Sequence, residues 1–301
     1  MAGMNVLTDA LLRLSLLPVR GLGRLPLAWS RALCRPLGSL MSLLMRRRRA
    51  VVDRNLALCF PEREPHARRA IRRAHFRHLA DSLAETALVW CRPGRLDARF
   101  GELVGIEHLH NAQADGQGVL MVTGHATCME LGARLVGERV TASAIYRPLR
   151  HAVLERFQNE GRARYAAGMI ARDDVRSMVR HLRAGGVLWY APDQDFGPAR
   201  SAFAPFFGLP TATPTGLLDL VRLGRARVVP MYPVKQPDGR VRVHFEPPWE
   251  DYPSADPVAD LARFNAFLER YVRAHPAQYW WLHRRFKTAP PDGPDRYGPE
   301  P

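Results

Sequence analysis

The sequence has few cysteines, and their spacing suggests neither a metal site nor a disulfide framework. Its four cysteines, Cys34, Cys59, Cys91 and Cys128, are far apart and form no C-x-x-C pair. Zinc sites and disulfide-rich folds usually show closely spaced or patterned cysteines, so neither is indicated. We expect free, mostly buried thiols in a protein of a reducing compartment.

The sequence also lacks a hydrophobic run long enough to cross a bilayer. Arginines interrupt the leucine-rich residues 1–45, and the uncharged run from Pro36 to Met45 is far short of the roughly 18 apolar residues of a spanning helix. No small-residue cleavage site follows a single apolar core, so no secretory signal peptide is expected. Short apolar stretches between arginines are typical of a segment in the membrane interface, with leucines and Trp29 in lipid. The alternative is a pair of surface helices packed on the domain's own core.

Acidic residues are scarce relative to basic ones. The sequence has 29 Asp and Glu residues and 44 Lys and Arg residues, which gives a net charge of +15, nearly all of it from arginine. This excess predicts attraction to an anionic lipid surface, an acidic protein or nucleic acid. Nucleic acid is not favoured, because the basic region 46–77 shows no recognition-helix, zinc-finger or RNA-binding signature and no aromatic residues placed as stacking platforms.

Beyond residue 99, short apolar runs alternate with helical patterns. We expect strands at 118–123, 141–146, 187–190, 228–232 and 241–245, and helices at 62–90, 130–136, 153–167, 173–183 and 215–223. This alternation predicts an α/β fold with a mixed, mainly parallel central sheet flanked by helices. The expected organisation is a membrane-associating helical segment over 1–45, one α/β domain over 46–290 and a disordered tail over 291–301.

The most informative local pattern is a buried strand that ends in Gly124–His125 and leads directly into a helix. Ligand sites in such sheets gather beyond the carboxyl ends of the strands. A carboxylate on one imidazole nitrogen makes the other nitrogen a better general base, and Glu130 is within reach if His125 precedes the first helical turn. Two alternatives compete: a structural histidine, and Cys128 as a nucleophile, although no second histidine lies near Cys128 in the sequence.

Several segments together resemble a known family. The His125-x-x-x-x-Glu130 element resembles the His-x-x-x-x-Asp/Glu motif of the glycerolipid acyltransferase superfamily. One branch, the lipid A biosynthesis acyltransferases that add secondary acyl chains, is similar from about residue 40 to Pro290. The segments that resemble this branch are Tyr146–Arg147–Pro148–Leu149, Asp193–Gln194–Asp195–Phe196–Gly197 with the following Phe203–Gly208, Val229–Pro230, and Gln278–Thr288.

The chain departs from the family pattern in two places. The family commonly has Gly-His-Phe-Gly-Asn-Trp-Glu where this chain has Gly-His-Ala-Thr-Cys-Met-Glu. The histidine and the glutamate are retained, but the aromatic and asparagine residues are replaced. The preferred acceptor and the preferred acyl-chain length are therefore left open. The N-terminus also lacks the spanning helix of many relatives, so peripheral attachment is expected.

The resemblance implies transfer of a fatty acyl group from an acyl thioester, usually acyl carrier protein, to a hydroxyl of a lipid A precursor. His125 would act as general base and Glu130 would orient its ring, at the cytoplasmic face of a bacterial inner membrane. No cofactor or metal is expected, because a thiolate is a good leaving group. The alternatives are another glycolipid or an ornithine-type lipid as acceptor, or a non-catalytic relative that binds lipid.

Six further residues are expected to bind substrate through their charge or polarity. The guanidinium group of an arginine can bind a phosphate or a carbonyl oxygen. The alternative is that these arginines form surface ion pairs or are solvated charges. The aspartates and the glutamine can bind acceptor hydroxyls or orient a basic residue, and the alternative is that they cap a turn. Two aspartates could also suggest a magnesium site, but the sequence shows no third ligand for the ion. The six residues are Arg147, Asp193, Gln194, Asp195, Arg284 and Arg285.

Overall fold

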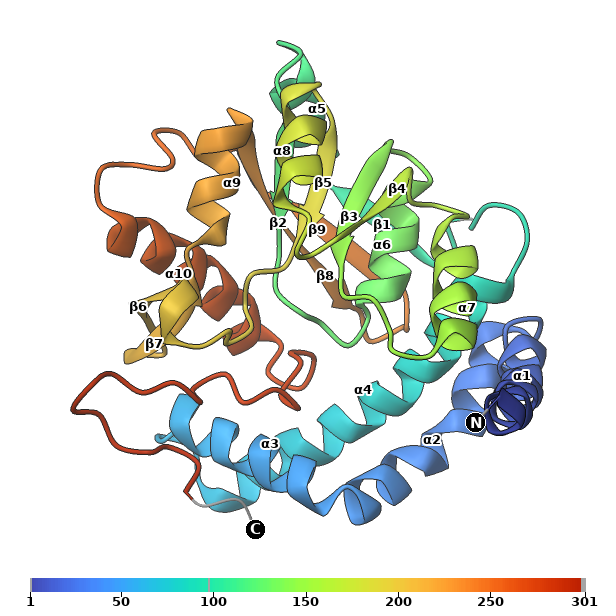
Figure 1. Ribbon diagram of the computed structural model, residues 1–301. Helices are drawn as coiled ribbons and strands as arrows, with labels where there is room; N and C mark the ends of the chain where they lie inside the picture. Colours follow the sequence, from blue (N-terminus) through green and yellow to red (C-terminus); the bar gives the residue numbers. More distant parts are fainter. Residues whose placement is uncertain (1, 97, 299–301) are drawn as a thin grey trace.

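A seven-stranded sheet forms the centre of the computed structural model, which describes residues 2–96 and 98–298, with side chains from residue 8 (Figure 1). In sheet order the strands are β1 (Gly101–Val104), β9 (Val241–Phe245), β8 (Arg227–Lys235), β2 (Val119–Val122), β5 (Val187–Tyr190), β3 (Ala142–Tyr146) and β4 (Gly168–Ala171). Only the β8–β9 pair is antiparallel, and the other neighbouring pairs are parallel. The predicted mixed, mainly parallel sheet is therefore confirmed.

The sequence patterns missed the short strands β1 and β4 and a separate two-stranded ribbon of β6 (Ser201–Phe206) and β7 (Leu209–Pro214). The ribbon was missed because Pro205 pairs with Pro210 near its turn, and proline lowers the expectation of a strand. The helix predicted at 153–167 ends at Arg162, because the chain turns there and Ala167 donates its backbone N–H to Ala142 O, 2.8 Å away, where the β3–β4 ladder begins.

Helices cover both faces of the sheet. Gly132 packs so closely on Pro233 that a Cβ there would lie 2.8 Å from the proline Cβ, whereas Tyr271 stacks on the neighbouring Tyr232 at a centroid distance of 4.9 Å. Because successive strand residues point to opposite faces, the helices that carry Gly132 and Tyr271 lie on opposite sides. The helices of this domain are α5 (Ile106–Gln113), α6 (Met129–Gly137), α7 (Ala152–Arg162), α8 (Val175–Arg183), α9 (Gly216–Gly224), α10 (Pro257–Ala274) and the short η1 (Pro198–Arg200).

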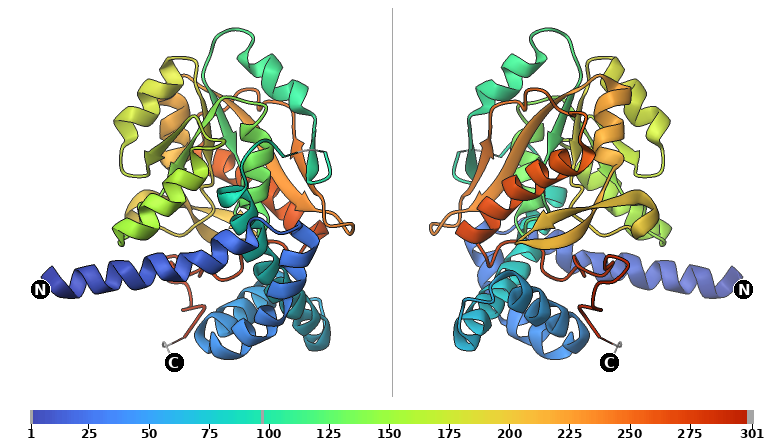
Figure 2. Two further views of the ribbon diagram at one scale, coloured as in Figure 1. Left: turned by 90° about the vertical axis from the view of Figure 1, so that its right-hand side faces the viewer. Right: turned by 90° about the vertical axis from the view of Figure 1, so that its left-hand side faces the viewer.

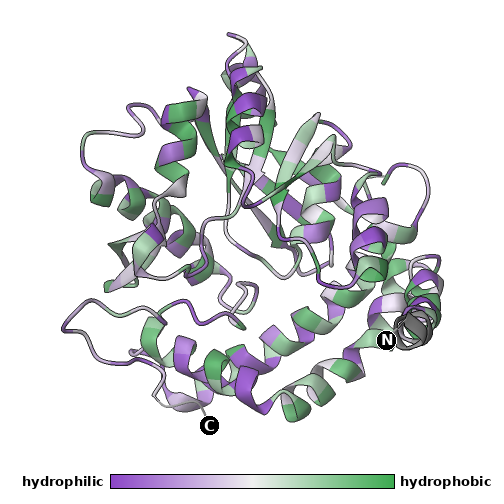
Figure 3. Cartoon of the chain, viewed as in Figure 1, coloured by the Kyte–Doolittle hydropathy of each residue, from purple (hydrophilic) through white to green (hydrophobic). Residues whose placement is uncertain are grey.

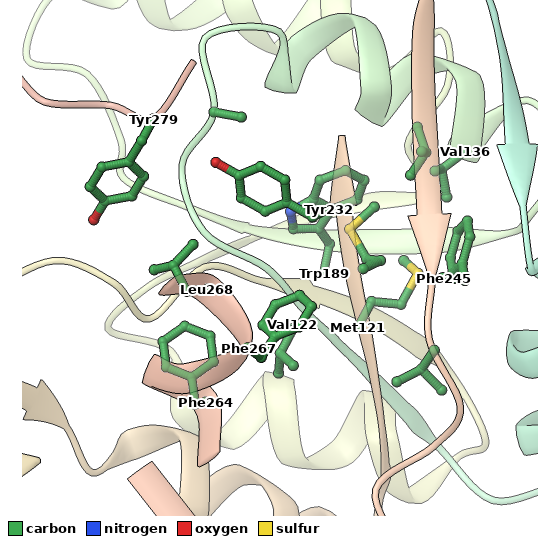
Figure 4. Close-up of a cluster of buried hydrophobic side chains, with 14 of the residues drawn as sticks. Met121, Val122, Val136, Trp189, Tyr232, Phe245, Phe264, Phe267, Leu268 and Tyr279 are labelled. Carbon is green, nitrogen blue, oxygen red and sulfur yellow. The ribbon is translucent and has the colours of Figure 1, made fainter. Parts of the chain in front are cut away.

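Every residue of β2 is buried in the core. Met121 and Val122 of β2 lie in one cluster with Trp189 of β5 and with Phe267 and Leu268 of α10 (Figure 4). A strand buried on both faces cannot shift its register without moving apolar side chains out of the core. The loop that follows β2 therefore starts from a fixed position.

Four N-terminal helices lie below the sheet domain in Figure 1, and α1 extends away from the rest of the chain in Figure 2. Ser30, Cys34 and Gly38 form the buried side of the second helix, which packs along the fourth. Among the described residues, no helix combines the length and the apolar character needed to cross a membrane. The four are α1 (Ala2–Leu22), α2 (Leu27–Leu44), α3 (Arg46–Cys59) and α4 (Pro65–Cys91).

A buried charge cluster joins these helices to the sheet. Arg31 of α2 donates to Glu85 Oε1 of α4 at 2.8 Å, and Lys235 of β8 forms an ion pair with the same carboxylate. The side chains of Glu85 and Lys235 are 1% and 5% exposed. Since such charges are costly to bury alone, each group keeps the others in place.

The C-terminal segment was predicted to be disordered over 291–301. Its described part, 291–298, has no helix or strand, yet it packs on the body. The Tyr297 hydroxyl donates to Asn55 Oδ1 at 2.5 Å, and Arg296 donates to Pro210 O at 2.8 Å. This anchoring differs from the prediction, because two side chains find hydrogen-bond partners on the body that composition cannot show. Residues 299–301 lie outside the described part.

Candidate active site

His125 lies in the loop between β2 and α6, at the carboxyl edge of the sheet. Asp193 follows β5, the parallel neighbour of β2, so the same edge carries both residues. His125 Nδ1 lies 2.5 Å from Asp193 Oδ1, and the His125 backbone N–H donates to Asp193 Oδ2 at 2.8 Å. One carboxylate therefore holds both the ring and the backbone of the histidine.

The loop that carries His125 is held by close packing and by a distant segment. A Cβ on Gly124 would lie 2.3 Å from Leu268 Cδ1, so the observed approach requires glycine. The Trp280 backbone N–H donates to His125 O at 3.0 Å, and the Thr127 N–H donates to Gln278 O at 2.8 Å. The segment that contains Gln278 and Trp280 thus supports the His125 loop.

The two side chains alter each other's proton affinity. Burial lowers the pKa of His125, but the charge and hydrogen bond of Asp193 raise it by more, and the pKa lies above its ordinary value. Burial raises the pKa of Asp193, but His125 lowers it by more, so the carboxyl stays ionised well into the acid range. The His125 side chain is 24% exposed and that of Asp193 is 2% exposed. A neutral His125 that donates from Nδ1 to Asp193 presents Nε2 as a base.

The side-chain amide of Gln194 is beside that basic nitrogen. Its Nε2 lies 3.4 Å from His125 Nε2, and Gln194 is partly exposed. The contact is long, so an incoming hydroxyl can replace it at the imidazole.

The predicted pairing of Glu130 with His125 needs correction. Glu130 accepts hydrogen bonds from the Trp90 indole N–H at 2.9 Å and the Tyr165 hydroxyl at 2.8 Å, and it forms an ion pair with Arg162. Burial raises the pKa of Glu130, but Arg162 and these bonds lower it by more. His125 precedes α6 while Glu130 lies in its first turn, and the glutamate side chain contacts α4 and the α7 region instead. Asp193 is the carboxylate on the His125 ring.

Asp195 serves the local chain rather than an open site. Its carboxylate accepts from the Thr288 backbone N–H at 2.7 Å, from the Thr288 hydroxyl at 2.8 Å and from the Gly197 N–H at 2.9 Å. Its own N–H donates to His283 Nε2 at 3.0 Å. These contacts agree with the capped-turn alternative and join two of the family-like segments.

The three arginines expected to bind substrate differ in their surroundings. Arg147 is exposed after β3. Arg284 is partly buried, with its guanidinium carbon 5.5 Å from the centre of the Tyr297 ring. Arg285 is 1% exposed and donates to Ala212 O at 2.7 Å and Thr213 Oγ1 at 3.1 Å. Its prediction as a substrate-binding residue is corrected, because the buried guanidinium is bound within the protein.

Cys128 is not available as a nucleophile. The residue is 1% exposed, and burial raises the pKa of its thiol to about 12. A thiol reacts through its thiolate, so this cysteine is structural. Within residues 2–96 and 98–298, no three His, Cys, Asp or Glu side chains gather in a way that could hold a metal ion.

Comparison with known proteins shows which family the chain belongs to. The profile of the family described as "Bacterial lipid A biosynthesis acyltransferase" matches residues 4–288. The lipid A biosynthesis lauroyltransferase of Escherichia coli is 39% identical over 263 residues, which cover 87% of this chain and 86% of the relative. The lipid A biosynthesis palmitoleoyltransferase of the same organism is 35% identical over 256 residues, covering 84% and 83%. A solved structure, the 1-acyl-sn-glycerophosphate acyltransferase of Thermotoga maritima, covers 81% of this chain and 96% of its own, with 13% identity and a TM-score of 0.39. On the strength of the profile and the two relatives, the chain belongs to the bacterial lipid A biosynthesis acyltransferase family and is an acyltransferase.

Proposed function

We propose that the protein transfers a fatty acyl group from an acyl thioester, carried by acyl carrier protein, to a hydroxyl of a lipid A precursor. The observation that carries the mechanism is the His125–Asp193 pair at the carboxyl edge of the sheet. The named activities of the relatives support lipid A as the acceptor class.

In this mechanism His125 Nε2 removes the proton from the acceptor hydroxyl as its oxygen attacks the thioester carbonyl. Asp193 keeps the proton on Nδ1 and stabilises the imidazolium that forms. The tetrahedral intermediate then expels the thiolate, which receives the proton from the imidazolium. General base assistance of this kind contributes about 10²–10⁴-fold to the rate.

Glu130 enters the proposal as a positioning residue. Its carboxylate gathers Arg162, Trp90 and Tyr165 at the start of α6, with the Glu130 and Arg162 side chains each 18% exposed. An ionised glutamate in this place keeps a guanidinium fixed beside the helix that follows the His125 loop. We assign Arg147, Gln194 and Arg284 to substrate contacts, since all three are at least partly exposed.

The same proposal places α1 and α2 on the cytoplasmic surface of the inner membrane. Trp29, Leu33, Leu37, Leu40 and Leu44 are exposed at helical spacing on α2, on a face next to the buried side that packs on α4. Figure 3 shows hydrophobic colouring recurring along α2 between hydrophilic residues. On α1, three exposed leucines continue the apolar surface, and arginines flank both helices. An apolar stripe edged with arginine suits an anionic lipid interface.

The reaction is tested with purified protein in detergent, several acyl carrier protein thioesters and a phosphorylated lipid A precursor. Wild type should acylate the precursor, and His125→Ala should lose the activity while it keeps its thermal unfolding transition. If wild type is inactive with every donor but binds the precursor, lipid A is not the acceptor. An active His125→Ala variant would contradict the role of the base.

A further inference from the structure

A cavity of about 260 Å³ lies away from the His125–Asp193 pair, where α1, α4 and α7 meet, and neither residue of the pair lines it. Pockets that hold drug-sized ligands have volumes of about 300–1,000 Å³, so this smaller cavity suits a compact polar group rather than a whole lipid. Its lining includes Arg20, Arg24, Trp90, Cys91, Phe157 and Arg164.

The cavity has a positive charge that its own residues do not balance. Arg20, Arg24 and Arg164 line it, and the acidic residue among the lining groups, Glu160, is bound by Arg156 of α7 at 2.6 Å. Burial raises the pKa of the Cys91 thiol, whereas the charges of all three lining arginines lower it, so the three guanidinium groups act on the same lining thiol. Like charges held together repel each other, and an anion between them relieves that repulsion.

Packing holds the arginines at the cavity. A Cβ on Gly23 would lie 2.2 Å from Ala87 O, so the end of α1 rests directly on the α4 backbone. The Arg20 guanidinium carbon lies 5.7 Å from the centre of the Phe157 ring, and Arg164 Nε donates to Trp90 O at 2.9 Å. These contacts hold the guanidinium groups of Arg20 and Arg164 at the cavity before any ligand binds, which lowers the entropy that binding costs.

The cavity adjoins the surface that we assign to the membrane. Leu14 and Leu17 of α1 are 59% and 54% exposed, and Arg20 follows Leu17 by about one helical turn. With these leucines in the lipid interface, the cavity is at the depth of the lipid head groups. Its Trp90 wall also donates to Glu130, so the cavity is joined to the cluster at the start of α6.

We propose that this cavity binds a phosphate ester of a membrane lipid between Arg20, Arg24 and Arg164. Guanidinium forks match phosphate oxygens in charge and geometry. The proposal rests on the proposed function, since that function brings the protein to phosphorylated lipids. The phosphate comes either from the glycolipid acceptor or from ordinary phospholipid, and the experiment separates these sources.

Cys91 provides a direct measure of occupancy. It is partly exposed and lines the cavity, whereas Cys34, Cys59 and Cys128 are at most 2% exposed. The alkylation rate of Cys91 by a maleimide is measured by peptide mass spectrometry, on the full chain in detergent and without any acyl donor. The probes are a phosphorylated lipid A precursor, the same lipid after dephosphorylation, phosphatidylglycerol and inorganic phosphate.

The phosphorylated precursor at about ten times its Kd should slow the labelling about tenfold, because the unliganded fraction alone reacts. The dephosphorylated lipid should have no such effect. Protection by the precursor alone identifies an acceptor-phosphate site, and equal protection by phosphatidylglycerol identifies a general head-group site. Protection by inorganic phosphate at the same concentration shows that the phosphate alone suffices. Labelling that no phosphate compound slows overturns the proposal.

Variants test the assignment of the arginines. Arg24→Gln and Arg164→Gln should each raise the protecting concentration about 10–100-fold, the effect of losing one charged hydrogen bond. Arg176→Gln removes the same charge from an exposed position on α8 and is the matched control. The proposal also fails if the control weakens protection as much as the cavity variants. Protection without acyl transfer would contradict the proposed reaction alone, and transfer without protection would contradict the cavity alone.

Discussion

Exchange of Asp193 for asparagine tests the His125–Asp193 pair most directly. In the structure both carboxylate oxygens are used, one by the His125 ring at 2.5 Å and the other by the His125 backbone N–H at 2.8 Å. In Asp193→Asn the amide oxygen can still accept from the backbone N–H, and the amide NH₂ then faces Nδ1 as a donor. The neutral ring must then carry its proton on Nε2, which is the nitrogen needed as the base.

An imidazole held in the wrong tautomer costs about 10⁴-fold in kcat, and we expect a loss of this order in Asp193→Asn. The pH profile carries a second signal. His125 must be neutral to accept a proton, so activity rises as pH increases through its pKa. Asp193 raises that pKa, and its removal should shift the acid limb of the profile to lower pH.

The assay is single-turnover acyl transfer against pH for wild type, Asp193→Asn and Glu130→Gln. Glu130 is bound by Trp90, Tyr165 and Arg162, and the acid limb should stay in place in its variant even if the rate falls. An acid limb that moves in Glu130→Gln and stays unchanged in Asp193→Asn would refute the reasoning, because it would restore glutamate as the partner of the imidazole.

Three other predictions concern packing, buried charge and the membrane surface. Gly124→Ala should destabilise the protein by about 1–3 kcal/mol in urea unfolding, because Leu268 Cδ1 lies 2.3 Å from the new Cβ. The double variant with Leu268→Ala should lose less stability than the sum of the two single losses, and simple additivity would contradict this contact. Glu85→Gln should lower the free energy of unfolding by about 3–5 kcal/mol, since buried Arg31 loses its carboxylate and Lys235 keeps only Asp81, and an unchanged denaturation midpoint would show that the cluster is dispensable. Replacing both Leu14 and Leu17 by glutamate should weaken sedimentation with anionic vesicles about tenfold or more, given about 1.5–3 kcal/mol for each buried leucine. Unchanged vesicle binding would exclude α1 from the interface.

Local sequence patterns were sufficient for the elements that have strong local signals. Continuous apolar runs revealed β2, β5 and β8, and Gly185–Gly186 correctly marked the end of α8. They failed at β4, which is only partly buried along its length, and at the β6–β7 ribbon, where proline lowers the expectation of a strand, because pairing with a neighbour stabilises these strands more than their own residues do. The described part of the C-terminal tail is a similar case, since Tyr297 is held by Asn55 of α3.

At the site, the chain alone was enough to place His125 at the end of a buried strand, since both the strand and the following helix are encoded locally. It also provided the segments that resemble the family. Only the fold decided which carboxylate meets the imidazole. Asp193 is 68 residues from His125 in sequence but follows the adjacent parallel strand, whereas Glu130 is five residues away and is bound by Arg162. Strand order brings distant residues to one edge of the sheet, and spacing along the chain carries no record of that order.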